Sequence, residues 1–271
     1  MMELYLRGDI EQAWGDSDPF QEVEKLQGDI YRNKEGRVTL QTQINGKSFF
    51  VKIHRGIGWK EIFKNLLQLR LPIIGASNEF AAAERLAALG VDTLSTAAFG
   101  KKGINPARQH SFILTDDLSN TISLEDYCAD WKNNPPSFAH KKSLIELLAK
   151  VSRVMHGAGI NHRDYYICHF LLEKNSLVDL TNPKCYLIDL HRAQLRKKTP
   201  MRWAVKDVAG LYFSAMDIGL TKRDCLRFIK IYSGQASLKN LNVSFWRAVN
   251  DKAMALYQKD HGQPSPCEKW W

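Results

Sequence analysis

The chain has 271 residues, of which 44% are apolar and 25% are charged, a composition typical of a soluble globular protein with one or two domains. It contains no run of 18 apolar residues, no signal-peptide pattern and no CxxC pair among its five cysteines, which argues against a transmembrane helix, a secreted disulfide framework and a zinc site, and suits a reducing cytosol. The formal net charge of +9 favours an anionic partner: nucleic acid, an anionic membrane, a phosphorylated substrate or an acidic carrier protein.

The N-terminal part of the chain is predicted to be rich in strands. Asn45-Gly46 lies between two strand-like runs and is typical of a two-residue hairpin turn. Apolar residues then recur at helical spacing in two segments, which Pro72 and Gly75 separate. Strands are predicted over residues 29–32, 38–44, 47–54 and 111–114, and helices over 59–69 and 78–89.

The C-terminal part is predicted to be mostly helical. Helices are predicted over residues 144–155, 205–216 and 223–232, and a strand over 185–190. A strand-rich part followed by a helical part indicates an α+β fold with two unequal lobes and a cleft between them. We expect an N-terminal lobe of residues 1–117, a shortened C-terminal lobe of residues 118–271 and a hinge near residues 116–119.

The strongest chemical signal is the tripeptide His162-Arg163-Asp164, which directly follows the predicted helix over residues 144–155. Asp189 follows 25 residues later, at a predicted strand end, and this layout resembles the catalytic loop and the metal-binding aspartate of protein kinases. In such enzymes the first aspartate orients or deprotonates the attacking hydroxyl, and the second binds the Mg²⁺ that bridges the ATP phosphates. Asp207 resembles the buried helix aspartate that supports the catalytic loop.

Lys52 lies inside an apolar strand and resembles the kinase lysine that contacts the α- and β-phosphates of ATP. Its expected partner is a glutamate of the helix predicted over residues 78–89, with Glu79 as first choice and Glu84 as second. The segment over residues 112–118 resembles the hinge of small-molecule kinases. Backbone groups of Asp116 and Leu118 would then bind adenine.

Three departures from the protein-kinase pattern narrow the prediction. There is no GxGxxG, so the turn that covers the phosphates would lie near residues 33–37, with Gly36 alone. His169 replaces the asparagine of the catalytic loop, and its imidazole could bind a metal or a phosphate. The aspartate motif reads Asp189-Leu190-His191 and no APE follows, which favours a constitutive small-molecule or glycan kinase over a kinase regulated by an activation loop.

Longer strings extend the resemblance. FVKIHRGIGWKEI, SLEDYCADW, GINHRDYYICHFLL and LIDLHRAQLR resemble the lipopolysaccharide core heptose(I) kinase family, with similarity from about residue 18 to about residue 232. The resemblance implies a protein-kinase-like fold and ATP-dependent phosphorylation of a heptose in the lipopolysaccharide inner core, usually at the 4-hydroxyl of the first heptose, at the cytoplasmic face of the inner membrane. It implies ATP and Mg²⁺ as cofactors.

Carried over to this chain, the family pattern assigns Asp164 as the catalytic base, with His162 and Arg163 in the same motif. Lys52 matches the ATP position and Asp189 the metal position. His169 also matches the family's variant of the catalytic loop.

The acceptor would be a phosphorylated, acidic glycolipid. Residues 191–203 follow the metal aspartate and contain six histidine, lysine or arginine side chains. We expect Arg192 and Arg196 to contribute to acceptor binding, because a guanidinium pairs well with phosphate and carboxylate. The alternative is a solvated basic loop.

The helix predicted over residues 59–69 has a second interpretation. Its apolar stripe is flanked by Lys60, Lys64 and Arg70, which suits an interfacial helix on an anionic membrane. An acidic acyl carrier protein could use the same kind of surface. The commoner arrangement is a helix packed on the N-terminal sheet.

Alternative functions also fit parts of the pattern. A kinase for Kdo or for the second heptose would keep Lys52, Asp164 and Asp189 and differ on the acceptor side. Protein tyrosine kinase activity would need an activation segment that the sequence lacks. A kinase-like binding protein without catalysis would not need all three residues. Nucleic-acid binding is supported by charge alone, since no zinc finger or aromatic RNA-binding signature is present. We expect no nucleic-acid partner.

Overall fold

The computed structural model describes residues 2–34, 36–67, 72–179, 181–235 and 237–265. The chain folds as two compact units, and neither is a single stretch of sequence. The first contains Met1–Arg85, Leu94–Ser119 and Leu190–Arg192, and the second contains Leu86–Thr93, Asn120–Asp189 and Ala193–Trp271.

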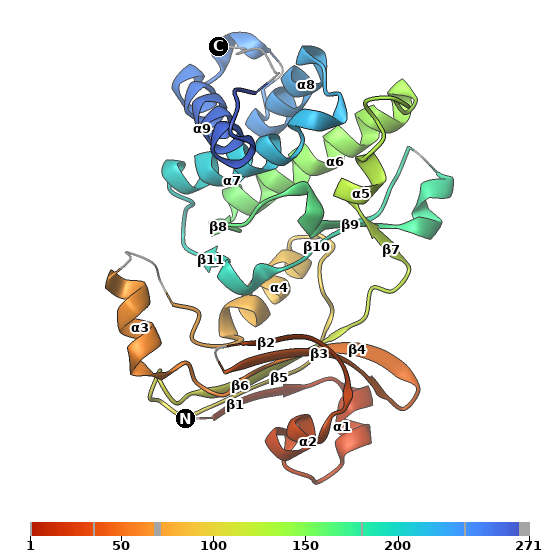
Figure 1. The fold of residues 1–271 in the computed structure, drawn as a ribbon. Helices are drawn as coiled ribbons and strands as arrows, with labels where there is room; N and C mark the ends of the chain where they lie inside the picture. The colour runs from red at the N-terminus through yellow and green to blue at the C-terminus, as the bar shows by residue number, and fades with distance from the viewer. Residues whose placement is uncertain (1, 35, 68–71, 180, 236, 266–271) are drawn as a thin grey trace. The chain divides into compact units, whose positions relative to one another are not determined.

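The first unit is built on a six-stranded sheet with the order β1-β5-β6-β4-β3-β2, in which all neighbours are antiparallel (Figure 1). The predicted hairpin between β3 and β4 is present: Asn45 and Gly46 have φ angles of 50° and 77°, the left-handed values that such a two-residue turn requires. The strands are β1 (Met2–Leu6), β2 (Gly28–Lys34), β3 (Arg37–Ile44), β4 (Lys47–His54), β5 (Thr96–Lys102) and β6 (His110–Asp116).

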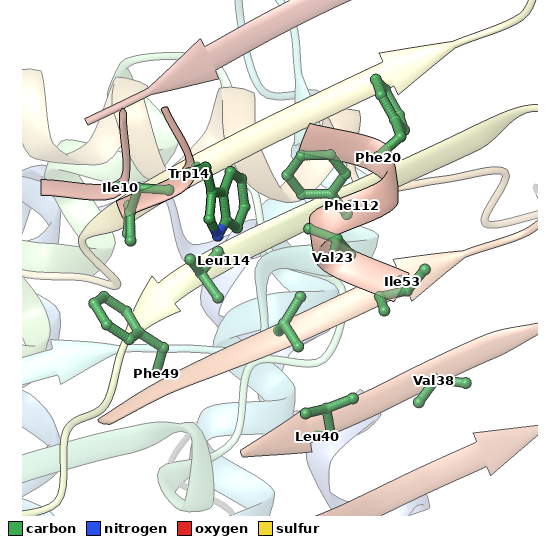
Figure 2. Close-up of a cluster of buried hydrophobic side chains, with 13 residues drawn as sticks. Ile10, Trp14, Phe20, Val23, Val38, Leu40, Phe49, Ile53, Phe112 and Leu114 are labelled. Carbon is green, nitrogen blue, oxygen red and sulfur yellow. The ribbon is translucent and has the colours of Figure 1, made fainter. Parts of the chain in front are cut away.

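Helices cover both faces of this sheet, and the alternation of side chains along β6 shows why. Phe112 and Leu114 point to the face covered by α1 and α2, where they meet side chains such as Trp14 (Figure 2). Ile113 points to the other face and packs with Phe80 of α4. The helices of this unit are α1 (Gly8–Trp14), α2 (Pro19–Lys25), α3 (Gly58–Leu67) and most of α4 (Ser77–Ala88).

The second unit is mostly helical. A small sheet with the order β10-β9-β7 and the pair β11-β8 are its only named strands in the described part of the chain. Helix α7 packs along α9, and α6 packs along α8 (Figure 1). The elements are β7 (Thr121–Ser123), α5 (Leu124–Cys128), α6 (Phe138–Gly157), β8 (Ile160–Asn161), β9 (Phe170–Glu173), β10 (Cys185–Leu187), β11 (Gln194–Leu195), α7 (Met201–Ser214), α8 (Lys222–Ser233) and α9 (Val243–His261).

The predicted α+β fold, with a strand-rich part and a mostly helical part, is confirmed. The strand predicted over residues 185–190 is wrong in its second half. β10 ends at Leu187, because Asp189 has a left-handed φ of 62° that a strand does not accept, and residues 190–192 form a 3₁₀ turn. No helix in the described ranges has the length and apolar character needed to cross a bilayer.

Candidate active site

The loop after β8 carries His162, Arg163 and Asp164, and the buried carboxylate of Asp207 on α7 fixes its backbone. The N–H groups of His162 and Arg163 donate to the two oxygens of Asp207 at 2.6 and 2.8 Å. Arg163 has a φ of 78°, a left-handed conformation that costs a non-glycine residue about 1–2 kcal/mol. Asp207 is therefore a buried helix residue that holds this loop, as predicted, and the catalytic role of the loop stays a prediction.

A glycine lets α7 approach this loop closely. A Cβ atom on Gly210 would lie 2.9 Å from the carbonyl oxygen of Tyr165. Tyr165 is itself buried, and its hydroxyl forms a hydrogen bond of 2.8 Å with that of Ser152 on α6. The residues that flank Asp164 are thus fixed from two helices.

His156, at the end of α6, adds a third link that the sequence did not predict. Its Nε2 atom lies 3.3 Å from Asp207, and its Nδ1 atom lies 2.8 Å from the hydroxyl of Tyr232 on α8. A histidine at the end of an amphipathic helix carries no pattern that distinguishes this role from an ordinary packing role. Only the tertiary structure brings α7 and α8 to it.

His162 connects the loop after β8 to the segment that carries Asp189. Its side chain is buried and its Nε2 atom lies 2.9 Å from the carbonyl oxygen of Ile188. Burial lowers the pKa of His162, and the hydrogen bond to Ile188 only partly opposes this shift. A neutral imidazole that donates from Nε2 satisfies both observations.

The structure brings Asp164, His169 and Asp189 together. The Nδ1 atom of His169 lies 2.6 Å from the carbonyl oxygen of Asp164, and its Nε2 atom lies 3.6 Å from the carboxylate of Asp189. Burial alone would lower the pKa of His169. Its contacts with Cys168, Asp164 and Asp189 outweigh burial and raise the pKa to about 9. A histidine in place of asparagine therefore links the two carboxylate residues.

The residues of this site fit a Mg²⁺ ion that takes most of its ligands from water and substrate. Within the described residues no group of three or more histidine, cysteine or acidic side chains could hold a metal ion. Mg²⁺ does not need such a cage, because it is usually bound by one or two carboxylates together with waters and substrate phosphates. The side chain of Asp189 is 30% exposed and so presents a carboxylate to a ligand. His169 offers nitrogen, which Mg²⁺ accepts less readily than oxygen.

Lys52 and Glu79 form an ion pair in the first unit, with 2.5 Å between Nζ and Oε1. Lys52 lies on β4 and Glu79 in the first turn of α4, so the expected pairing is present, whereas Glu84 is exposed. The Glu79 side chain is 1% exposed, so Lys52 is needed to compensate a buried charge. The role of the pair in ATP binding stays a prediction.

The predicted adenine-binding segment is held by its side chains. The carboxylate of Asp116 pairs with Arg7 and Lys47, both at 2.7 Å, and its N–H donates to the carbonyl of Ser95. Burial alone would raise the pKa of Asp116, but the hydrogen bonds from Arg7 and Lys47 outweigh it and bring the pKa to about 2. The ion pair between Arg7 and Asp116 was not predicted. Leu118 also belongs to this unit, and its role remains a prediction.

The two predicted acceptor-binding arginines lie in different units, Arg192 in the first and Arg196 in the second. Arg196 follows β11, and its guanidinium donates to the side-chain oxygens of Asn161 and Gln194, both at 2.5 Å. It also lies 5.9 Å from the ring centre of Trp203. Their roles in acceptor binding stay predictions.

Comparison with known proteins places these residues in a family. Residues 21–232 match the family described as lipopolysaccharide kinase (Kdo/WaaP). The chain belongs to this family. The matched region contains all predicted site residues, from Lys52 to Arg196, whereas β1 and α9 lie outside it.

Relatives in the lipopolysaccharide kinase family are close in sequence. The chain is 52% identical over 231 residues to "Lipopolysaccharide core heptose(I) kinase WaaP" of Pseudomonas aeruginosa, which covers 85% of this chain and 86% of that protein. It is 54% identical over 228 residues to the Escherichia coli protein of the same name, which covers 84% of this chain and 86% of the relative. A solved structure, "WaaP in complex with acyl carrier protein", is 43% identical with a TM-score of 0.82, over 94% of this chain and 99% of that one.

Proposed function

We propose that this protein is an ATP-dependent kinase that phosphorylates a heptose of the lipopolysaccharide inner core, at the 4-hydroxyl of the first heptose. The observation that carries the proposal is the identity of 52% or more to two proteins that are named core heptose(I) kinases. The hydrogen bonds that fix the backbone around Asp164 support a phosphotransferase over a binding protein without catalysis.

Phosphoryl transfer depends mainly on positioning and on charge neutralisation. Asp164 would accept or orient the proton of the sugar hydroxyl, and Asp207 holds its loop in place. Lys52, oriented by Glu79, would bind the α- and β-phosphates. Mg²⁺, held by Asp189 and the phosphates, would supply neutralising charge when bound with ATP.

The deciding experiment incubates the purified protein with ATP and core lipopolysaccharide that lacks the heptose phosphate, then maps the new phosphate by ³¹P–¹H correlation NMR. We expect phosphate at the 4-hydroxyl of heptose I, and a fall in kcat of about 100-fold or more for Asp164→Asn. Asp179→Asn, at an exposed turn, is the control. Phosphate on Kdo or on the second heptose would reassign the acceptor, and full activity of Asp164→Asn would reject the mechanism.

We also propose an acyl carrier protein as a partner, because the solved relative is in complex with one. An apolar cavity of about 90 Å³ lies inside the second unit, where Leu144, Val208 and Trp246 contribute to its lining, and a fatty acyl chain would match this surface. A groove lined by residues of α6 and α8 contains five cations and one acid, which suits an acidic protein. The groove cations are Lys150, Arg153, Arg223, Arg227 and Lys230.

This partnership is testable by copurification. Val208→Trp should fill the cavity and reduce the recovery of acylated carrier protein. The double variant Arg223→Glu, Lys230→Glu should weaken the binding of both the acylated and the unacylated carrier protein. Lys252→Glu on the exposed face of α9 is the matched charge control. Recovery that is unchanged in all three variants would reject the proposal.

A peripheral contact with the cytoplasmic face of the inner membrane is the third part of the proposal. Helix α3 buries only Ile62 among its residues, whereas Trp59 is 49% and Phe63 is 58% exposed. This exposure favours the interfacial interpretation over a helix packed on the sheet, and exposed Lys60 and Lys64 would face anionic headgroups. Residues 68–69 of the predicted helix, and Arg70, lie outside the described residues.

Flotation with vesicles that contain or lack anionic lipid tests the membrane contact. We expect wild type to float only with anionic vesicles and Phe63→Asp to stay in solution. Ile104→Asp, which changes an 83% exposed apolar side chain outside α3, is the control. No flotation of wild type in either case would reject the contact.

A further inference from the structure

Trp203, in the first turn of α7, is surrounded by four cationic side chains. Arg163 of the catalytic loop and Arg202 each place the guanidinium carbon 5.3 Å from the centre of the indole. Arg196 and Lys206 lie 5.9 Å from it. We call these five residues the Trp203 cluster. They come from three separate segments of the second unit.

The cluster is a local concentration of positive charge. All four cationic groups lie within 5.9 Å of the centre of one indole. The N-terminus of α7 adds positive potential, and its first turn contains no acidic residue. Pro200 precedes the helix and its side chain provides no cap. The face of the indole attracts each of these cations through a cation–π contact.

Two of the cations belong to residues whose backbone the structure holds in place. The N–H of Arg163 donates to Asp207, which fixes the backbone of this residue. The N–H of Arg196 donates to the carbonyl of Gly159 at 2.9 Å, beside the β8–β11 pair, and its guanidinium donates to two neutral amide oxygens. A Cβ atom on Gly159 would lie 1.9 Å from the carbonyl oxygen of Arg196, so glycine is needed for this approach.

We propose that the Trp203 cluster is a subsite for an anionic group, a phosphate or a carboxylate, on the saccharide acceptor. Guanidinium groups bind both anions with the same two-pronged geometry. Arg163 is the neighbour of Asp164 in the chain, and under the proposed function Asp164 faces the acceptor hydroxyl, so we assign the anion to the acceptor. The inference rests on the proposed function and names which part of the acceptor is recognised.

The first test measures acceptor KM for Arg202→Gln and Lys206→Gln, two members outside the catalytic motif. Arg247→Gln, an exposed arginine on α9, is the matched control. We expect an increase of about 10-fold in acceptor KM for each cluster variant, with ATP KM unchanged, because each loses one charge-assisted hydrogen bond. Arg202→Lys should recover part of the loss.

Chemically altered acceptors identify the anion. If phosphate is recognised, dephosphorylated core oligosaccharide should bind wild type and Arg202→Gln equally well, whereas carboxyl-reduced oligosaccharide should keep the difference. The reverse pattern identifies a carboxylate. A KM difference that persists on both altered acceptors would overturn the subsite.

A binding measurement without turnover separates this inference from the proposed function. In protein labelled with 5-fluorotryptophan, the ¹⁹F signal of Trp203 is assigned by its loss in Trp203→Phe, and it should shift when anionic core oligosaccharide is added. A shift without phosphorylation of any acceptor would retain the subsite and reject the heptose kinase. Phosphorylation without a shift, and with cluster variants that behave like Arg247→Gln, would reject the subsite alone.

Discussion

Replacing Asp207 with asparagine tests how the loop that carries Asp164 is held. The substitution removes a charge and puts an NH₂ group against one of two backbone N–H donors, those of His162 and Arg163, which now donate at 2.6 and 2.8 Å. A hydrogen bond to a charged group contributes about 1.5–3 kcal/mol, so we expect a loss of about 2 kcal/mol in the stability of the second unit. Arg163 would also be released from its left-handed conformation.

Activity should fall by more than stability alone explains. A displacement of the loop by about 1 Å can reduce the rate about 100-fold, so we expect that decrease in kcat at a temperature where the variant is fully folded. ATP KM should change less than kcat, because Lys52 and Glu79 belong to the other unit, whereas Asp189 lies in the same unit as Asp207. Urea unfolding followed by circular dichroism gives the stability, and the acceptor assay gives kcat.

Asp224→Asn is the matched control. Asp224 is also buried, caps α8 and pairs with Lys141 at 3.0 Å, so its loss should destabilise the same unit without displacing the catalytic loop. Wild-type kcat and stability in Asp207→Asn would refute the reasoning. An equal loss of kcat in both variants would also refute it, because the effect would then be one of general destabilisation.

Three further outcomes are expected. Lys52→Met should lower the melting temperature and weaken ATP binding, since it leaves Glu79 buried without its cation. Adding Glu79→Leu should restore the melting temperature but not ATP binding. Recovery of both in the double variant would contradict this prediction. Gly210→Ala should lose about 1–3 kcal/mol in urea unfolding, because its Cβ atom would meet a carbonyl oxygen, whereas Gly157→Ala, with open space, should be near neutral. Burial, with a smaller effect of neighbouring cations, lowers the pKa of His54 from 6.5 to about 3. The contribution of neutral His54 to the stability of the fold is therefore complete above pH 6.5 and is lost as the pH falls toward 3. A His54→Leu variant should therefore show a flatter acid limb of stability against pH, and an unchanged limb would contradict the assignment.

Much of the fold and part of the site could be predicted from local patterns. The Asn45-Gly46 hairpin, the helical spacing in α6 and the strand around Lys52 all depend on neighbouring residues in sequence, and all are present in the structure. The pairing of Lys52 with Glu79 needed a family comparison, since no periodicity joins a strand to the following helix.

The remaining features depend on contacts between distant segments. The contact between His156 and Asp207 joins residues that are 51 positions apart in sequence, and the cations around Trp203 come from three segments. Asp189 ends β10 early by taking a left-handed φ, a conformation that the apolar pattern around it does not reveal. Residues 2–6 lack the alternation of a half-buried strand, because β1 is mostly exposed.

The position of β1 has a practical consequence for handling the protein. This strand pairs with β5 along its whole length and forms one edge of the six-stranded sheet. Removing residues 2–6 would leave the N–H and carbonyl groups of β5 open to another chain, which promotes association between sheets. The second residue after that strand, Gly8, begins α1, and Arg7 between them binds Asp116. Trimming the first seven residues should therefore cause aggregation and also loosen the segment around Asp116.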